Sequence, residues 1–124
     1  MISSIGLDIV EVARIERDIK QYGDRFVSRI LSRAELAAFD KRVDAAIFLA
    51  GRFAAKEAVI KALDRYFEDR PAFNVIEIIN DAGGKPELRL PQEIQDRMGQ
   101  AHCLLSITHE KNYAAAVAVF EEGQ

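Results

Sequence analysis

Residues 45–67 constrain the fold of this chain more than any other segment. They include no proline, one glycine and many alanines, and alanine has the highest intrinsic helix propensity. The segment therefore predicts one long helix. Because alanine side chains are short, their number also predicts that another element packs closely against this helix.

Size and composition are those of a chain that folds around its own core. It has 124 residues, of which 49% are hydrophobic and 30% charged, which excludes a disordered chain and predicts a single domain over residues 1–124. The apolar stretches are short and interrupted by charge, and no basic segment precedes an apolar one at the start. We therefore expect no membrane span, no signal peptide and a cytoplasmic location.

The chain contains a single cysteine, Cys103. A lone cysteine excludes an internal disulfide and a cysteine-based zinc site. Because Cys103 is followed directly by two leucines, we expect its side chain to lie in the core.

The first residues predict a strand followed directly by a helix. Residues 3–7 are mostly apolar, as in a short strand. Asp8 then stands three positions before Glu11, and a side-chain acceptor with an acidic residue three positions later is the pattern of a capping box. We therefore expect a helix to begin near Ile9, with Asp8 as its cap.

Two more short helices are expected before the long one. Residues 24–31 follow a glycine and have helical character. Ser32 and Glu35 form a second capping-box pattern, which predicts a third helix that ends at about Arg42.

The C-terminal half predicts two β-hairpins separated by a short helix. Aromatic and β-branched residues mark the strands, and turn residues separate them. The expected strands are residues 73–79, 87–90, 102–108 and 113–120, with a helix from Pro91 to about Gly99. This order of elements predicts an α+β fold with an antiparallel sheet.

A basic segment stands within an acidic chain. The net charge is −3, which argues against general nucleic-acid binding. Residues 12–33 nevertheless hold six basic and three acidic residues, a local charge of +3. The segment is either a docking face for an acidic partner or a solvated helical face with ion pairs four residues apart.

Three places combine polar side chains with well-patterned apolar segments. Asp8 either caps a helix or binds a metal ion. Glu57 and Lys61 share one face of the long helix, whereas Lys56 points about 100° away. This pair is either an ordinary ion pair or a Mg²⁺-binding carboxylate with an ammonium group beside a phosphate. His109, in the expected C-terminal hairpin, is either a turn residue or a contact for phosphate, metal or a proton.

Three segments together carry a family resemblance. They are residues 5–15 (IGLDIVEVARI), 48–63 (FLAGRFAAKEAVIKAL) and 106–119 (SITHEKNYAAAVAV). Their motifs, order and spacing, in a chain of this length, resemble those of the holo-acyl-carrier-protein synthases, the small 4′-phosphopantetheinyl transferases. The resemblance spans nearly the whole chain.

The resemblance implies a fold and a reaction. The fold is an antiparallel sheet packed on a long central helix, with short N-terminal helices. The reaction transfers 4′-phosphopantetheine from coenzyme A to a serine of an acidic acyl carrier protein, requires Mg²⁺ and releases adenosine 3′,5′-bisphosphate. The resemblance also implies a role in fatty acid biosynthesis and a homotrimer with active sites between subunits. We expect neither a nucleic acid nor a membrane as a partner.

The resemblance implies roles for individual residues at the reaction centre. Asp8 and Glu57 match the acids that bind Mg²⁺, and Lys61 matches a lysine that faces the phosphates. These three residues are the expected catalytic set. Arg52 and His109, together with Lys61, are the expected contacts for coenzyme A.

Two further features follow from the same resemblance. Arg14 matches the start of a basic helix that docks the carrier protein, and Arg25 and Phe26 are expected to continue that face. Relatives carry a glycine-containing loop after the central helix, whereas residues 64–72 of this chain contain no glycine. Arg65 or Arg70 is a candidate substitute for the phosphate contacts of that loop.

Three classes of function stay open at this point. The first is the transferase. The second is a different Mg²⁺-dependent phosphate enzyme, such as a coenzyme A hydrolase, which would consume coenzyme A without a carrier protein. The third is a non-catalytic module for an acidic partner, which would have no use for Asp8, Glu57 and Lys61.

Overall fold

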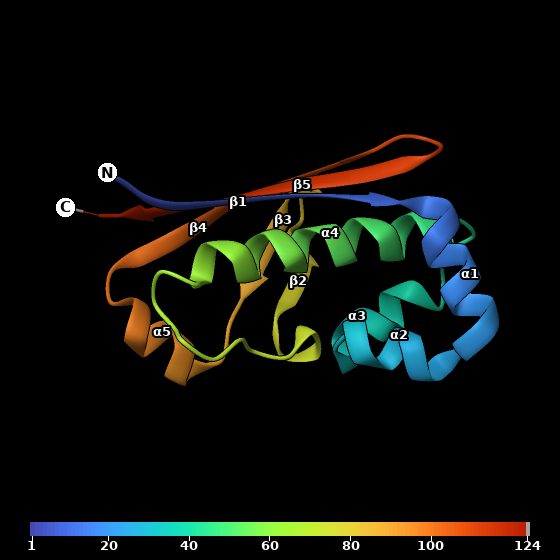
Figure 1. The fold of residues 1–124 in the computed structure, drawn as a ribbon, viewed down its shortest axis with the longest axis horizontal. Coiled ribbons are helices and arrows are strands. Elements are labelled where there is room, and N and C mark those ends of the chain that lie inside the picture. The colour runs from blue at the N-terminus through green and yellow to red at the C-terminus, as the bar shows by residue number, and fades with distance from the viewer. Residues whose placement is uncertain (124) are drawn as a thin grey trace.

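The computed structural model describes residues 1–123, shown as a ribbon in Figure 1. In chain order the elements are β1 (Ile2–Glu11), α1 (Val12–Tyr22), α2 (Asp24–Ile30), α3 (Arg33–Phe39), α4 (Ala45–Leu63), the 3₁₀ turn η1 (Phe73–Val75), β2 (Glu77–Asn80), β3 (Pro86–Arg89), α5 (Gln92–Met98), β4 (Ala101–His109) and β5 (Tyr113–Glu122). The expected α+β fold, with an antiparallel sheet on a long central helix, is confirmed.

Helix α4 runs through the middle of the molecule (Figure 1). Strands β1, β5 and β4 form an antiparallel sheet in that order along one side of α4. The β2–β3 hairpin, α5, α2 and α3 lie on its other side. Residues such as Leu49, Ala54, Ala58 and Val59 are fully buried, and buried residues occur around most of the circumference of α4, which explains why its apolar residues do not form one stripe. No helix among residues 1–123 is long and apolar enough to cross a membrane.

Strand β1 touches α4 at Gly6. A Cβ atom on this residue would overlap the carbonyl oxygen of Ala58. The neighbouring Ser4 hydroxyl donates a hydrogen bond of 2.7 Å to the carbonyl of Ala62. Strand and helix therefore meet backbone to backbone, which holds Asp8, two residues beyond Gly6, above α4.

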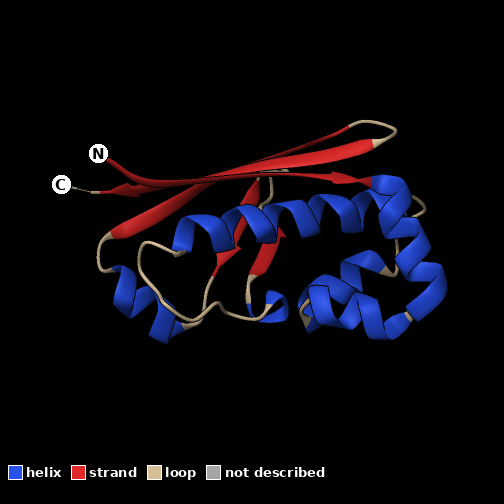
Figure 2. Cartoon of the chain, viewed as in Figure 1, coloured by secondary structure: helices blue, strands red, loops and turns tan. Residues whose placement is uncertain are grey.

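The opposite face of the three-stranded sheet is apolar. Ile5, Leu7 and Ile9 of β1 are 64%, 65% and 66% exposed. Val119 and Val117 of β5 stand beside Ile5 and Leu7 in the strand register. In the described part of the chain no element covers this face (Figure 2). An apolar surface of this kind marks an interaction site.

The expected helix start near Ile9 is wrong. Strand β1 continues to Glu11, and α1 begins at Val12. The cause is pairing with β5, which extends along β1 as far as Glu11 opposite Tyr113. Asp8 is therefore a strand residue whose carboxylate caps no helix, and α1 has no side-chain cap.

The other expected elements form with shifted ends. The capping box of Ser32 and Glu35 is present in full. Helices α3 and α4 end three and four residues earlier than expected, and residues 73–79 form η1 followed by β2 instead of one strand. Cys103 is partly buried against the core, and this burial raises the pKa of its thiol to about 12, so that the thiol is inert at neutral pH.

Candidate active site

A cluster of opposite charges forms where β1 crosses α4. Because side chains alternate along a strand, Asp8 projects to the same side of β1 as Gly6, toward α4. The ammonium group of Lys61 donates hydrogen bonds to Oδ1 of Asp8 at 3.1 Å and to the carbonyl of Leu7 at 3.0 Å. The side chains of Asp8 and Lys61 are 17% and 47% exposed, so a ligand can reach both.

Glu57 lies on the same side of α4 as Lys61, one turn earlier. Its side chain is half-buried. We define the acidic cluster as Asp8, Glu57 and Lys61. Among the described residues, no group of three or more His, Cys, Asp or Glu side chains is arranged to hold a metal ion. Two carboxylates do not form an all-protein cage, but they fit Mg²⁺, which binds through one or two carboxylates, substrate phosphates and water.

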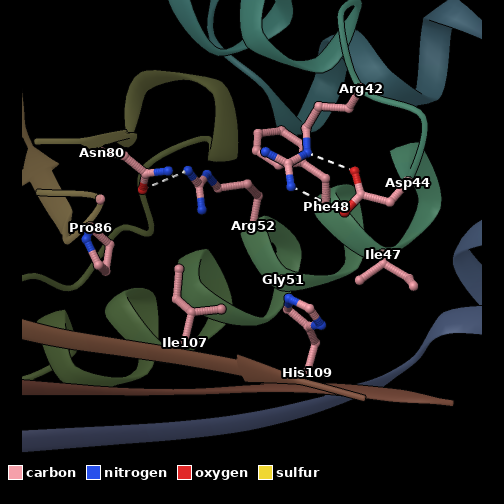
Figure 3. A pocket seen from close by; sticks show the side chains of 11 residues that line it. Arg42, Asp44, Ile47, Phe48, Gly51, Arg52, Asn80, Pro86, Ile107 and His109 are labelled. Carbon is pink, nitrogen blue, oxygen red and sulfur yellow. Dashed lines mark hydrogen bonds and ion pairs between the residues drawn. The ribbon is translucent and has the colours of Figure 1, made fainter. Parts of the chain in front are cut away.

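A separate cavity of about 180 Å³ opens beside the N-terminal half of α4 (Figure 3). We call it the arginine pocket. Its lining comes from α4, from the segment before it, from the β2–β3 hairpin and from β4: Arg42, Asp44, Ile47, Phe48, Gly51, Arg52, Asn80, Gly84, Pro86, Ile107 and His109. His109, at the end of β4, points into it.

Arg52 is the buried cation of this pocket, with 8% of its surface exposed. One terminal nitrogen donates to Oδ1 of Asn80 at 3.3 Å, and the guanidinium carbon lies 4.7 Å from the centre of the Phe48 ring. Its buried Nε has no hydrogen-bond partner. Burial lowers the pKa of Arg52, and the charge of nearby Glu35 opposes that effect. An unsatisfied buried donor on a cation points to an anionic ligand.

Arg42 contributes a second guanidinium to the pocket. It lies 4.7 Å from the Phe48 ring centre and donates two hydrogen bonds, of 2.8 and 3.0 Å, to Asp44 (Figure 3). These bonds lower the pKa of Asp44 and raise that of Arg42. Phe48 therefore lies next to two cations in the lining of the pocket.

The acidic cluster and the arginine pocket lie on opposite sides of α4. Nine residues separate Arg52 from Lys61, which turns the side chain by about 180° around the helix axis. The five expected reaction-centre residues therefore fall into two groups. Asp8, Glu57 and Lys61 lie on one side of α4, and Arg52 and His109 lie on the other. Within one chain the structure does not bring the two groups together.

The expected docking residues lie on α1 and α2. Arg25 and Phe26 line a groove of about 400 Å³ between these helices, together with Asp18, Tyr22 and Arg29. Arg14 does not line this groove. Its guanidinium carbon lies 5.8 Å from the ring centre of Phe53, on α4.

Comparisons with known proteins decide the family. The sequence matches the model of the 4′-phosphopantetheinyl transferase superfamily over residues 4–118. The chain belongs to this superfamily. It is 42% identical to the holo-[acyl-carrier-protein] synthase of Protochlamydia amoebophila, over 97% of this chain and 98% of the relative. The expected relation to the holo-acyl-carrier-protein synthases, and with it a transferase, is confirmed.

Solved structures of transferases in this superfamily share the fold. The holo-[acyl-carrier-protein] synthase from Neisseria meningitidis superimposes with a TM-score of 0.89 at 37% identity, over 98% of this chain and 100% of the other. The Helicobacter pylori enzyme, solved in complex with coenzyme A, gives a TM-score of 0.83 at 34% identity, over 94% and 99% of the two chains.

Sequence reasoning about this transferase overlooked part of the pocket. Arg42, Asn80 and Gly84 line it, although residues 80–86 were interpretable only as a turn and Arg42 only as a helix end. The available signal was the pair of glycines, Gly83 and Gly84, in the turn between Asn80 and Pro86. The glycine-bearing loop at the pocket is thus the β2–β3 turn, where Gly84 adopts a φ of 85°. Neither Arg65 nor Arg70 is among the lining residues.

Proposed function

We propose that this protein transfers 4′-phosphopantetheine from coenzyme A to a serine of apo acyl carrier protein and releases adenosine 3′,5′-bisphosphate. The observation that carries the proposal is the division of charge around α4. One side offers two carboxylates and an ammonium group, and the other offers two guanidiniums and a histidine. Coenzyme A likewise has two separate phosphate centres, a pyrophosphate and a 3′-phosphate. A solved relative holds coenzyme A.

The acidic cluster is the proposed reaction centre. Asp8 and Glu57 would hold Mg²⁺, which supplies charge neutralisation at the pyrophosphate. The serine oxygen forms a bond to the phosphorus on the pantetheine side, and the bond from that phosphorus to the oxygen of the adenylate phosphate breaks. The serine proton passes to Glu57 or to a water beside it. Lys61 stabilises the negative charge that develops on the departing phosphate.

The arginine pocket is the proposed site for the 3′-phosphate of coenzyme A. The buried charged side chains of residues 1–123 are Arg52, Lys56 and Glu35, which leaves one positive charge in excess. A bound phosphate offsets this charge and accepts a hydrogen bond from the free Nε of Arg52. His109 and Arg42 supply further contacts. His109 therefore serves binding in this scheme, and no step of proton transfer depends on it.

The separation of the two clusters supports active sites between subunits, as in the homotrimer that the resemblance implies. Because Arg52 and Lys61 face opposite sides of α4, one coenzyme A molecule joins the clusters only when the second cluster comes from a neighbouring chain. The exposed apolar strip of Ile5, Leu7 and Ile9 gives each chain a surface to bury against such a neighbour.

The carrier protein is proposed to dock on α1 and α2. Residues 12–33 carry the local charge of +3, and an acidic carrier is attracted to such a surface. Arg14 and Arg25 supply charge, and Phe26 supplies an apolar contact in the groove. A location in the cytoplasm and a role in fatty acid biosynthesis belong to the same proposal.

Intact-mass spectrometry of the carrier protein tests this function. Apo acyl carrier protein is incubated with coenzyme A, Mg²⁺ and the enzyme. The expected result is a mass gain of one phosphopantetheine, which is lost with a chelator and with Glu57→Ala and is kept with the matched control Glu68→Ala. Consumption of coenzyme A without a carrier would instead indicate a hydrolase. Carrier binding with no mass gain would indicate a binding module.

A further inference from the structure

A fully buried lysine stands next to Glu57. The side chain of Lys56 has no exposed surface, and its ammonium group donates to three acceptors from three segments. These are the carbonyl of Ile30 at the end of α2, Oε1 of Glu35 in α3 at 2.5 Å, and the carbonyl of Phe73 in η1 at 3.0 Å. Since an ammonium group has three hydrogens, each of them has a partner.

Glu35 is the anionic partner of Lys56, and we call this ion pair with its hydrogen-bond partners the Lys56–Glu35 node. Its side chain is 1% exposed. It accepts hydrogen bonds from the backbone N–H of Ser32 at 2.8 Å and of Ile78 at 3.1 Å, in addition to the bond from the ammonium group of Lys56. The ion pair of Lys56 and Glu35 therefore joins five elements, namely α2, α3, α4, η1 and β2. No polar side-chain atom of either residue is buried without a partner.

The hydrogen bond from Lys56 to Ile30 connects helix α4 to helix α2. Among residues 1–123 it is the hydrogen bond that links α2 to α4, and no other joins these two helices. Helix α2 carries Arg25 and Phe26 of the docking groove. Lys56 thus lies between the proposed carrier surface and the neighbouring acid Glu57.

Stability alone does not account for such an ion pair. Withdrawing two charges from water has a large free-energy cost, and replacing a buried pair by apolar side chains of similar size is often neutral or stabilising. What an ammonium group adds is direction, because its three bonds fix the positions of three segments around one atom. The same bonds tie α4, which carries Glu57 next to Lys56, to these three segments.

We propose that Lys56 is a positioning residue for carrier-protein transfer, an inference that rests on the proposed function above. By holding the end of α2 against α4, it keeps a carrier docked on α2 in the place where its serine meets the acidic cluster. The bond from Lys56 to Ile30 is not itself part of coenzyme A binding, because α2 contributes no residue to the arginine pocket.

Steady-state kinetics on a double variant test this role. Lys56→Met with Glu35→Gln removes both charges together, so that no unpaired charge is left in the interior. At a temperature well below the melting point, the KM for apo carrier protein is expected to rise about tenfold. The KM for coenzyme A is expected to rise clearly less, because Glu35 affects the arginine pocket only through its charge near Arg52 and its bond to Ile78. Ile60→Val, on the same helix, is the matched control, since it weakens packing and leaves the node intact. It is expected to lower the melting temperature without a change in either KM.

A second variant covers the case in which the double variant does not fold. Lys56→Arg keeps a cation opposite Glu35, but its planar group is larger and does not reproduce three bonds from one atom. It is expected to fold and to raise the KM for the carrier. An unchanged carrier KM in a folded variant, or an equal rise in both KM values, overturns the role of Lys56 alone. An inactive parent enzyme overturns the proposed function together with this role.

Discussion

The ammonium nitrogen of Lys61 lies 3.1 Å from Oδ1 of Asp8, and this ion pair joins β1 to α4 across 53 positions of sequence. It brings a cation to the carboxylate that would share a metal with Glu57. The contact exists because Gly6 lets the two backbones touch. A strand residue and a helix residue thus meet in one charged cluster, and each of them is testable separately.

The first prediction concerns the charge of Asp8. Asp8→Asn keeps an oxygen for Lys61 but removes a negative ligand from the proposed Mg²⁺ site. At least about tenfold more Mg²⁺ is expected for half-maximal transfer, because affinity at such sites depends on ligand charge. Mg²⁺ titration of the transfer rate gives the answer. Asp64→Asn, an exposed acid at the end of α4 that pairs with Arg70, is the control and is expected to titrate like the parent.

The second prediction concerns the contact of β1 with α4. Gly6→Ala forces a Cβ onto the carbonyl oxygen of Ala58, so that the strand has to move away. A loss of about 1–3 kcal/mol in the free energy of unfolding is expected from overpacking of this kind. Urea denaturation measures it. Gly83→Ala serves as the control, because its Cβ would meet an ordinary contact at 3.4 Å. Equal stability of the two variants would contradict the close approach.

The third prediction concerns the arginine pocket. Arg52→Met removes the buried guanidinium that is proposed to bind the 3′-phosphate, and charged hydrogen bonds contribute about 1.5–3 kcal/mol each. The KM for coenzyme A is therefore expected to rise about 10- to 150-fold, with little change for 3′-dephospho-coenzyme A. Arg97→Met, whose guanidinium carbon lies 5.3 Å from the Phe67 ring centre and outside the pocket, is the control. If both substrates lose affinity equally, the 3′-phosphate binds elsewhere.

The sequence predicted which helices and strands form more accurately than it predicted where each of them begins and ends. The alanine-rich segment identified α4, and Ser32 with Glu35 identified the start of α3, because both signals are local. The end of β1 was misplaced because Asp8 and Glu11 satisfy a local capping pattern, whereas the strand is decided by pairing with residues more than 100 positions away. Local signals do not report such pairing.

The candidate site shows the same division. Asp8, Glu57, Lys61, Arg52 and His109 were identified through motifs, and the structure places them in two clusters. Arg42 and Asn80 were not identified, because each belongs to a segment with an ordinary turn pattern and reaches the pocket only through tertiary packing. Lys56 was assigned only a direction away from Glu57. Its burial against Glu35 depends on how α2 and α3 fold back on α4, which no spacing rule contains.

The fourth prediction concerns carrier docking. Arg14→Glu reverses one charge in the basic segment of residues 12–33. The KM for carrier protein is expected to rise, and to rise further as salt screens the remaining charges. Coenzyme A binding, measured by calorimetry, is expected to stay nearly unchanged. Arg89→Glu, on β3, makes the same charge change away from the docking helices and is the control. An equal loss of coenzyme A affinity in Arg14→Glu would contradict the assignment of carrier docking and coenzyme A binding to separate surfaces.

The fifth prediction concerns active sites between subunits. Glu57→Ala and Arg52→Met impair different clusters, on opposite sides of α4. If each site takes its acidic cluster from one chain and its arginine pocket from the next, mixed assemblies regain intact sites. The two variants are unfolded and refolded together in equal amounts and assayed at a coenzyme A concentration well below the KM of Arg52→Met. About a quarter of parental activity is then expected from random assembly in a closed ring. Variants refolded separately and then assayed together without subunit exchange are the control. No recovery, in a mixture shown to contain hetero-oligomers, would place both clusters of each site in one chain.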